Sequence, residues 1–173
     1  MPMRILMALI IGAAFFAAGP VSAQQPAPAP AAAPPPAPEY GLPISTEQAK
    51  AAATAALAEA RKNNWRMAVA VVGPEGSVIY FEKMDGTQNA SFQLATAKAR
   101  TSALFRRPSK VFVDQFAAGN VAFMTFPDDA RPTASEGGLP ILVDGKIIGA
   151  IGVSGGTGQQ NGVAATAGIN AVK

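Results

Sequence analysis

Two residue types are missing from the 173-residue sequence, which contains no cysteine and no histidine. Without cysteine no disulfide can form, so stability has to come from a packed core and, where it occurs, from assembly. The same absence excludes Ser-His-Asp and Cys-His nucleophile systems, and zinc sites built from Cys and His. We therefore predict no catalytic residue and no metal site; any catalysis would have to use carboxylates, lysine or tyrosine.

Charged residues are also few, at 14% of the sequence, with 14 Lys and Arg against 11 Asp and Glu. Such a small positive excess does not indicate nucleic acid as a partner. The basic residues nevertheless gather in one stretch without acidic residues, at Lys98, Arg100, Arg106, Arg107 and Lys110. This stretch is either a solvated helix face and loop, or a docking surface for a small anion such as a carboxylate or a propionate.

The first 23 residues have the three-part layout of a secretory signal peptide. Arg4 supplies the positive start, residues 5–19 are apolar, and Val21-Ser22-Ala23 is a small-residue cleavage site. The apolar stretch is shorter than the ~20 residues that cross a bilayer, which disfavours a membrane anchor. We expect cleavage after Ala23 and a periplasmic or secreted mature protein.

Residues 24–39, "QQPAPAPAAAPPPAPE", alternate proline with alanine and contain no aromatic side chain. This composition predicts a disordered, extended and semi-rigid linker. It serves either as a spacer, which we favour, or as a proline-rich ligand for a recognition domain. Residues 40–173 are long enough for one domain with a real core.

The domain is expected to open with a helix and a hairpin. A capping-box pattern at residues 45–48 predicts a helix that runs to about Lys62. Two segments rich in β-branched and aromatic residues, 67–72 and 77–83, flank a Pro-Glu-Gly turn and predict paired strands.

Two helices are expected next. Phe92, Ala95, Ala99 and Ala103 recur at helical spacing within residues 90–105 and predict one apolar face. Ser109 is expected to cap a second, short helix. The sequence does not decide whether residues 121–126 form a strand or an irregular segment.

A second hairpin and a last helix complete the domain. Asp144-Gly145 between apolar segments 139–143 and 146–153 is a strong hairpin signal. Residues 159–172 predict a final alanine-rich helix. Hairpins imply antiparallel strand pairing with helices packed on the sheet, so the fold class is α+β.

The stretches "AxxKARTSALFRRPS" and "GGLPILVDGKIIGAIGVSGGTGxQ" resemble the GlcG/HbpS family of haem-binding and proposed haem-degrading proteins, which is related to the C-terminal domain of some PduO proteins. The resemblance covers roughly residues 44–172. It implies a profilin-like fold, with a central antiparallel sheet flanked by helices on both faces. It also implies homo-oligomers and, for extracellular members, binding of haem with a role in haem or iron sensing or in oxidative stress.

The candidate cofactor-binding residues belong to three motifs. They are Lys98, Thr101, Arg106 and Arg107; Gly137, Gly138 and Pro140; and Ser154, Gly155 and Gly156. The glycines after Val153 either permit a tight strand-to-helix connection or expose backbone N–H groups to an anion. Whether Gly137-Gly138 and residues 154–158 line one shared site is the question that the sequence raises.

Haem iron is most often held by His, Met, Cys or Tyr, of which the domain has only three methionines and two tyrosines. We therefore expect haem contact to be weak or transient, dominated by burial of the porphyrin and by pairing of arginine with propionate. Family members commonly carry an acidic residue just after the glycine turn, whereas Gly158-Gln159-Gln160-Asn161 is uncharged. A metal-binding or acid–base role at that place thus loses its support.

Three functions remain open, and we favour the first. It is a secreted, oligomeric haem- or tetrapyrrole-binding protein whose ligand is haem or another small anion. The second is an enzyme that acts on a small metabolite or degrades haem, with Lys98 and Glu136 as its polar candidates. The third is a non-catalytic scaffold or the partner of a membrane sensor.

Overall fold

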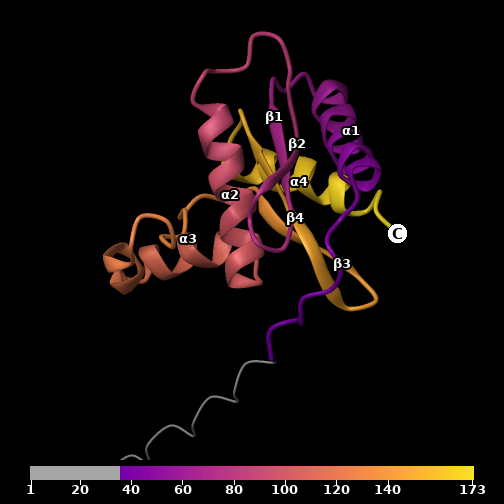
Figure 1. Cartoon of the computed structure of the whole chain (residues 1–173). Helices are drawn as coiled ribbons and strands as arrows, with labels where there is room; N and C mark the ends of the chain where they lie inside the picture. The colour runs from indigo at the N-terminus through magenta and orange to yellow at the C-terminus, as the bar shows by residue number, and fades with distance from the viewer. Residues whose placement is uncertain (1–35) are drawn as a thin grey trace, which may run out of the picture. The chain divides into compact units, whose positions relative to one another are not determined.

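The computed structural model describes residues 36–173, shown in colour in Figure 1. The expected signal peptide, its cleavage site and most of the linker lie outside these residues. Within them, no helix is both long and apolar enough to cross a bilayer. The elements in chain order are α1 (Thr46–Lys62), β1 (Ala68–Val72), β2 (Val78–Lys83), α2 (Ser91–Phe105), α3 (Lys110–Ala117), the 3₁₀ turn η1 (Ala122–Thr125), β3 (Gly138–Val143), β4 (Lys146–Ser154) and α4 (Gly158–Ile169).

The four strands form one antiparallel sheet in the order β2-β1-β4-β3. Each hairpin contributes one edge strand, and β1 pairs with β4 at the centre. Asp144 and Gly145 both have positive φ, 50° and 73°, as the Asp-Gly turn predicts. The α+β class and the two hairpins are confirmed.

Helices cover both faces of the sheet. Side chains of β1 point alternately to opposite faces, as in any strand. Val69 and Val71 belong to the core shared with α1 and α4, whereas Ala70 and Val72 pack toward α2. Figure 1 shows α2 on one side of the strands and α1 with α4 on the other.

Two glycines in the sheet let α2 lie close to it, because they have no side chain. A Cβ added at Gly152 would collide with the Ala95 carbonyl and stand 2.6 Å from the Ala99 nitrogen. One added at Gly138 would collide with the Lys98 carbonyl. The alanine face predicted for this helix is thus correct, and its partner is a pair of glycines on neighbouring strands.

Two local predictions are wrong. Helical spacing places Phe92 with the buried alanines of α2, but it is 48% exposed and packs edge-to-face on Phe81, with 4.9 Å between ring centroids. Ser109 precedes α3 but makes no side-chain cap. Its Oγ instead donates to the Ser135 carbonyl at 2.6 Å and accepts from the Gly138 N–H at 2.9 Å.

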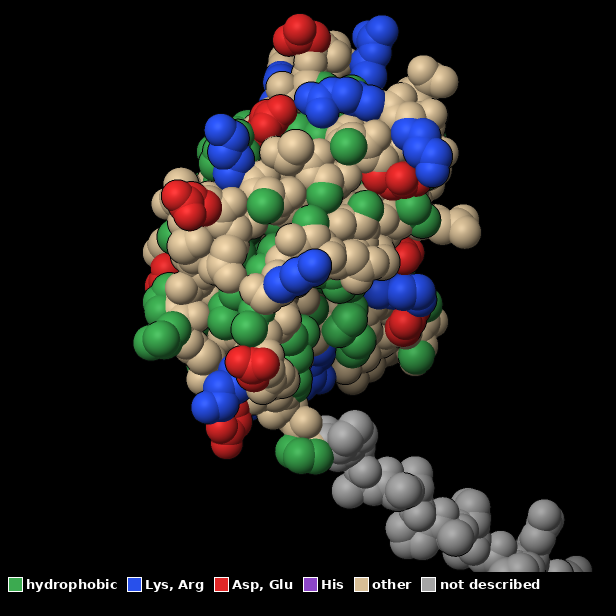
Figure 2. Space-filling view, turned by 90° about the vertical axis from the view of Figure 1, so that its right-hand side faces the viewer, with side chains coloured by type: hydrophobic (Ala, Val, Ile, Leu, Met, Phe, Trp, Pro, Cys, Tyr) green, Lys and Arg blue, Asp and Glu red, His purple; other side chains and the backbone are tan. Residues whose placement is uncertain are grey.

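The face that carries α1 and the C-terminus, at the right of Figure 1, is viewed directly in Figure 2. Positive and negative side chains are interspersed over it, and no extended patch of one sign is visible there. This agrees with the small net charge of the sequence.

Candidate functional site

Lys98 lies on the side of α2 that faces the sheet and is only 1% exposed. Its Nζ donates a hydrogen bond of 3.1 Å to the carbonyl of Val153. Removal from water lowers the pKa of this amine to about 8, and the nearby Glu136 carboxylate opposes part of that shift. This candidate is therefore a buried cation that ties α2 to β4.

Thr101, one helical turn further on, holds a loop against α2. Its hydroxyl donates to the Ala97 carbonyl at 2.8 Å and accepts the Thr133 N–H, also at 2.8 Å. Because both capacities of the hydroxyl are used, the loop of residues 127–133 is fixed over this helix.

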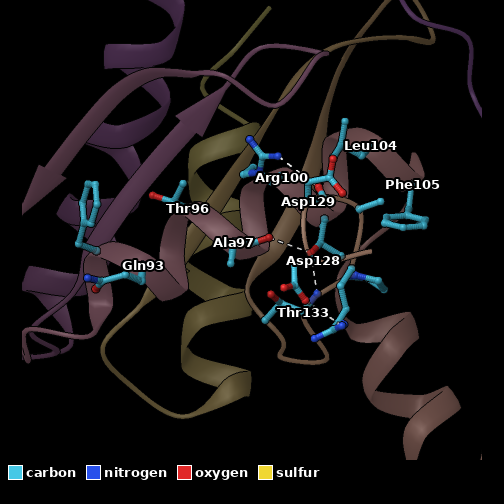
Figure 3. Close-up of a pocket in the computed structure, with 14 residues that line it drawn as sticks. Gln93, Thr96, Ala97, Arg100, Leu104, Phe105, Asp128, Asp129 and Thr133 are labelled. Carbon is cyan, nitrogen blue, oxygen red and sulfur yellow. Dashed lines mark hydrogen bonds and ion pairs between the residues drawn. The ribbon is translucent and has the colours of Figure 1, made fainter. Parts of the chain in front are cut away.

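A groove forms between α2 and that loop, with a volume of about 460 Å³. We call it the α2 groove, and Figure 3 shows its lining side chains. It runs from Phe92 to Phe105, about 20 Å at 1.5 Å per residue. Its walls consist mainly of apolar and small polar side chains: Phe92, Gln93, Thr96, Ala97, Thr101, Leu104, Phe105, Ala130, Pro132 and Thr133.

Four charged residues also line the α2 groove, two arginines and two aspartates. Arg100 donates to the carbonyls of Gly76 at 3.3 Å and Asp129 at 3.4 Å. Arg131 forms an ion pair of 2.8 Å with Asp128. A guanidinium has five N–H donors, so both arginines keep donors beyond these bonds.

A second hollow, the glycine hollow, has a volume of about 480 Å³. Gly137 and Gly138 line it together with the first turns of α4. The carboxylate of Glu136 lies over that helix, because Gly158 and Gly162 have no side chain there. Residues 36–173 offer this carboxylate no ion pair.

Gly155 and Gly156, which directly follow β4, do not join this hollow. Gly155 has φ of 144°, and a Cβ there would collide with the Arg66 carbonyl. The N–H and carbonyl of Gly156 are both bonded, at 3.1 Å each, by the side-chain amide of Asn161. Residues 154–156 therefore serve a tight connection, and among the candidate glycines Gly137 and Gly138 line the open hollow.

The helix that follows is capped by its own residues. Thr157 and Gln160 form a reciprocal capping box, in which each side chain accepts the other's backbone N–H. Together with the amide of Asn161, these bonds occupy three backbone donors of this turn, the N–H groups of Gly156, Thr157 and Gln160. The uncharged residues of this segment thus have a structural role.

The remaining candidates lie away from both hollows or at their margins. Pro140 is buried within β3, opposite Ala150. Arg106 ends α2 with φ of 54°, and its guanidinium lies 5.7 Å from the Tyr40 ring centroid. Arg107 is exposed and donates to the Phe105 carbonyl.

Sequence reasoning missed several residues that shape these sites, among them Arg131, Thr133 and Asn161. The first two belong to a loop without periodic pattern, and their position depends on contact with Thr101, 32 residues from Thr133. Asn161 had a usable signal, since an asparagine in the first turn of a helix is expected to use its amide locally.

The α2 groove suits a porphyrin ring better than it suits iron. None of its lining residues is His, Cys, Met or Tyr, the usual ligands of haem iron. The hydroxyl of Thr96 is buried without a hydrogen-bond partner in the described chain. Apolar walls, two arginines and small side chains fit the macrocycle and its carboxylates, whereas the groove offers a metal only oxygen donors, among them the carboxylates of Asp128 and Asp129.

Comparisons with known proteins agree with this fold. The model of the family described as "Haem degrading protein HbpS-like" matches residues 44–170. Protein GlcG of Escherichia coli (strain K12) is 40% identical over 111 residues, which is 64% of this chain and 81% of GlcG.

Two solved structures are similar in fold. A double mutant of Streptomyces reticuli HbpS has 27% identity and a TM-score of 0.70, covering 83% of this chain and 99% of that one. The PduOC:Heme complex has 22% identity and a TM-score of 0.70, covering 76% of this chain and 96% of that one. These similarities identify the architecture as the one expected, with a central antiparallel sheet between helices.

Proposed function

Because the chain belongs to the HbpS-like family, we propose that it binds haem, and that it does so in the α2 groove. The observation that carries this proposal is the groove itself, an apolar trough about 20 Å long with arginines on both walls. Ligand sites are typically concave and mostly apolar, with a few polar groups that orient the ligand. The description of the family and the haem complex of PduOC suggest the ligand class.

The charges of the α2 groove favour reversible binding. Asp128 and Asp129 balance Arg100 and Arg131, so the groove has no net positive field to attract propionates. Carboxylates would instead be held by individual guanidinium N–H groups, which pair with them in a planar geometry. This supports a transient haem contact in preference to a permanent cofactor.

The glycine hollow is less suitable for haem. The carboxylate of Glu136 stands in its wall, and Lys110 at its rim is paired with Asp114 at 2.6 Å. A ligand that carries two carboxylates would face repulsion there without a compensating cation. This difference favours the α2 groove as the haem site.

Hemin titration of the purified protein, followed through the Soret band, tests the proposal. Ala97→Trp fills the floor of the groove, and Ala58→Trp places the same side chain on the exposed side of α1. We expect a saturable shift for the wild type and for Ala58→Trp, and a loss of binding for Ala97→Trp. No saturable shift at micromolar wild-type protein, or equal binding by all three, would contradict the proposal.

We extend the proposal to export, homo-oligomer assembly, a membrane-sensor partner and a role in haem or iron sensing. The signal-peptide pattern supports export, and large apolar side chains exposed around α3, namely Phe116, Val121 and Met124, are of the kind that assemblies bury. Native mass spectrometry with and without hemin measures processing, assembly and ligand mass together. A monomer of unprocessed length under all conditions would contradict export and assembly.

A further inference from the structure

We infer that the α2 groove recognises the dicarboxylate tetrapyrrole ring and not its iron, so that metal-free porphyrins are ligands of the same site. This inference rests on the proposed function. It concerns which part of the ligand the described residues select.

The oxygen donors of the groove are unsuited to iron. The Thr101 hydroxyl is already engaged as both donor and acceptor. The Thr96 hydroxyl is buried, and the carboxylate of Asp128 is paired with an arginine. The Gln93 amide and the Asp129 carboxylate, which also line the groove, are oxygen donors, and neither belongs to the imidazole, thiolate, thioether or phenolate ligands that usually hold haem iron.

The ring, in contrast, has extensive partners. Ala97 lies on the floor of the groove, where a small side chain leaves room for a flat molecule. Phe92 and Phe105 stand at its two ends, as Figure 3 shows for Phe105. Burial of apolar surface and contact with aromatic rings do not depend on a metal at the ring centre. Removing the metal therefore leaves these contacts intact.

The two carboxylates of the ligand provide orientation. Arg100 comes from α2 and Arg131 from the loop of residues 127–133, so the guanidiniums approach from two walls of the groove. Their backbone bonds to Gly76, Asp129 and Phe126 hold them in place without using all their donors. A ring that lacks free carboxylates loses this contact.

Three ligands separate the possibilities: hemin, metal-free protoporphyrin and its dimethyl ester, each titrated into the wild type, Ala97→Trp and Ala58→Trp. Absorbance reports hemin binding, and porphyrin fluorescence reports the other two. We expect hemin and the metal-free ring to bind the wild type within about threefold of each other, and the ester about tenfold more weakly. Ala97→Trp should abolish binding of both acids, and Ala58→Trp should leave it unchanged.

The outcomes distinguish the two proposals. If hemin binds in the groove but the metal-free ring binds more than about tenfold less tightly, the inference fails and haem binding stands. If the ester binds as well as the acid, carboxylate recognition fails. If none of the three binds, the proposed function itself fails.

Discussion

The amine of Lys98 and the carbonyl oxygen of Val153 lie 3.1 Å apart beneath α2, where the lysine has lost nearly all contact with water. Most lysines are solvated, because burying an ammonium without full compensation is costly. Here one of three N–H donors has an acceptor among the described residues. The hydrogen bond from Lys98 holds the helix to the sheet, but the burial of its charge lowers the free energy of unfolding at neutral pH.

Lys98→Met should remove a pH dependence of stability. The folded-state pKa is about 8 and the ordinary value is 10.5, so between these values the unfolded chain binds more protons. Stability therefore rises with pH across this window, by up to about 3 kcal/mol from this group. The penalty is fully present below pH 8. Urea unfolding of the wild type and of the variant across the window measures the difference.

The exposed Lys50 on α1 supplies the matched control, as Lys50→Met. We expect this variant to keep the wild-type slope of unfolding free energy against pH. A Lys98→Met protein with the wild-type slope would show that the buried amine does not titrate in this range.

Thr101→Val should loosen the loop over the α2 groove. The variant leaves the Thr133 N–H without its acceptor, which costs about 1 to 2 kcal/mol of unfolding free energy. Hydrogen exchange at Thr133 should accelerate accordingly. Thr96→Val removes a hydroxyl that has no partner among the described residues, so it should be neutral or slightly stabilising. Equal destabilisation by both substitutions would contradict the role of the Thr101 hydroxyl.

Gly152→Ala should be strongly destabilising, since the added Cβ would meet the backbone of α2 at Ala95 and Ala99. Overpacking of this kind costs about 2 to 3 kcal/mol. Gly162→Ala is the comparison, because its Cβ meets only the flexible end of Glu136 at 2.9 Å and lies within α4. Thermal unfolding should show the second variant stabilised by roughly 0.5 to 1 kcal/mol. The reverse order would rule out the close packing of α2.

Arg100→Leu should weaken hemin binding roughly tenfold while preserving much of the apolar wall. The reason is the loss of a charge-assisted bond to a ligand carboxylate. Arg107→Leu, outside the groove, is expected to bind as the wild type does. A titration at two salt concentrations adds a second readout, because only the Arg100 variant should lose part of the salt dependence. Undiminished affinity of Arg100→Leu for hemin would show that Arg100 does not contact the ligand.

Much of the fold was predictable because its signals are local. Asp144-Gly145 specifies a turn by backbone conformation alone, and the capping box at Ser45 marks where α1 begins. The position of Phe92 was not predictable from helical spacing, since spacing shows that residues share a face but not what covers it. The sheet covers the alanines, and the larger ring is left outside.

The site was predictable only in part. Thr101 and Lys98 were both candidates, but they bond to different parts of the fold: Lys98 to the Val153 carbonyl on β4, and Thr101 to the Thr133 N–H in the loop. The glycines at 155 and 156 were compatible with two roles, close packing of the backbone and binding of an anion. The contacts of Gly155 with neighbouring backbone and the bond from Gly156 to Asn161 favour the first role. The α2 groove itself depends on a loop whose position is set by long-range contacts such as the bond from Thr133 to Thr101.

The chain enters the domain at residues 39–41, where the Ile147 N–H is bonded to the Glu39 carbonyl and the Tyr40 hydroxyl to the Ala103 carbonyl. The Pro38 carbonyl, just before them, also accepts a bond from Arg106. Of the bonds at residues 39–41, one leads into the second hairpin and the other into the C-terminal end of α2, beside the groove. A pull on the preceding residues would therefore be carried both to the second hairpin and to the end of α2, the helix that lines the α2 groove.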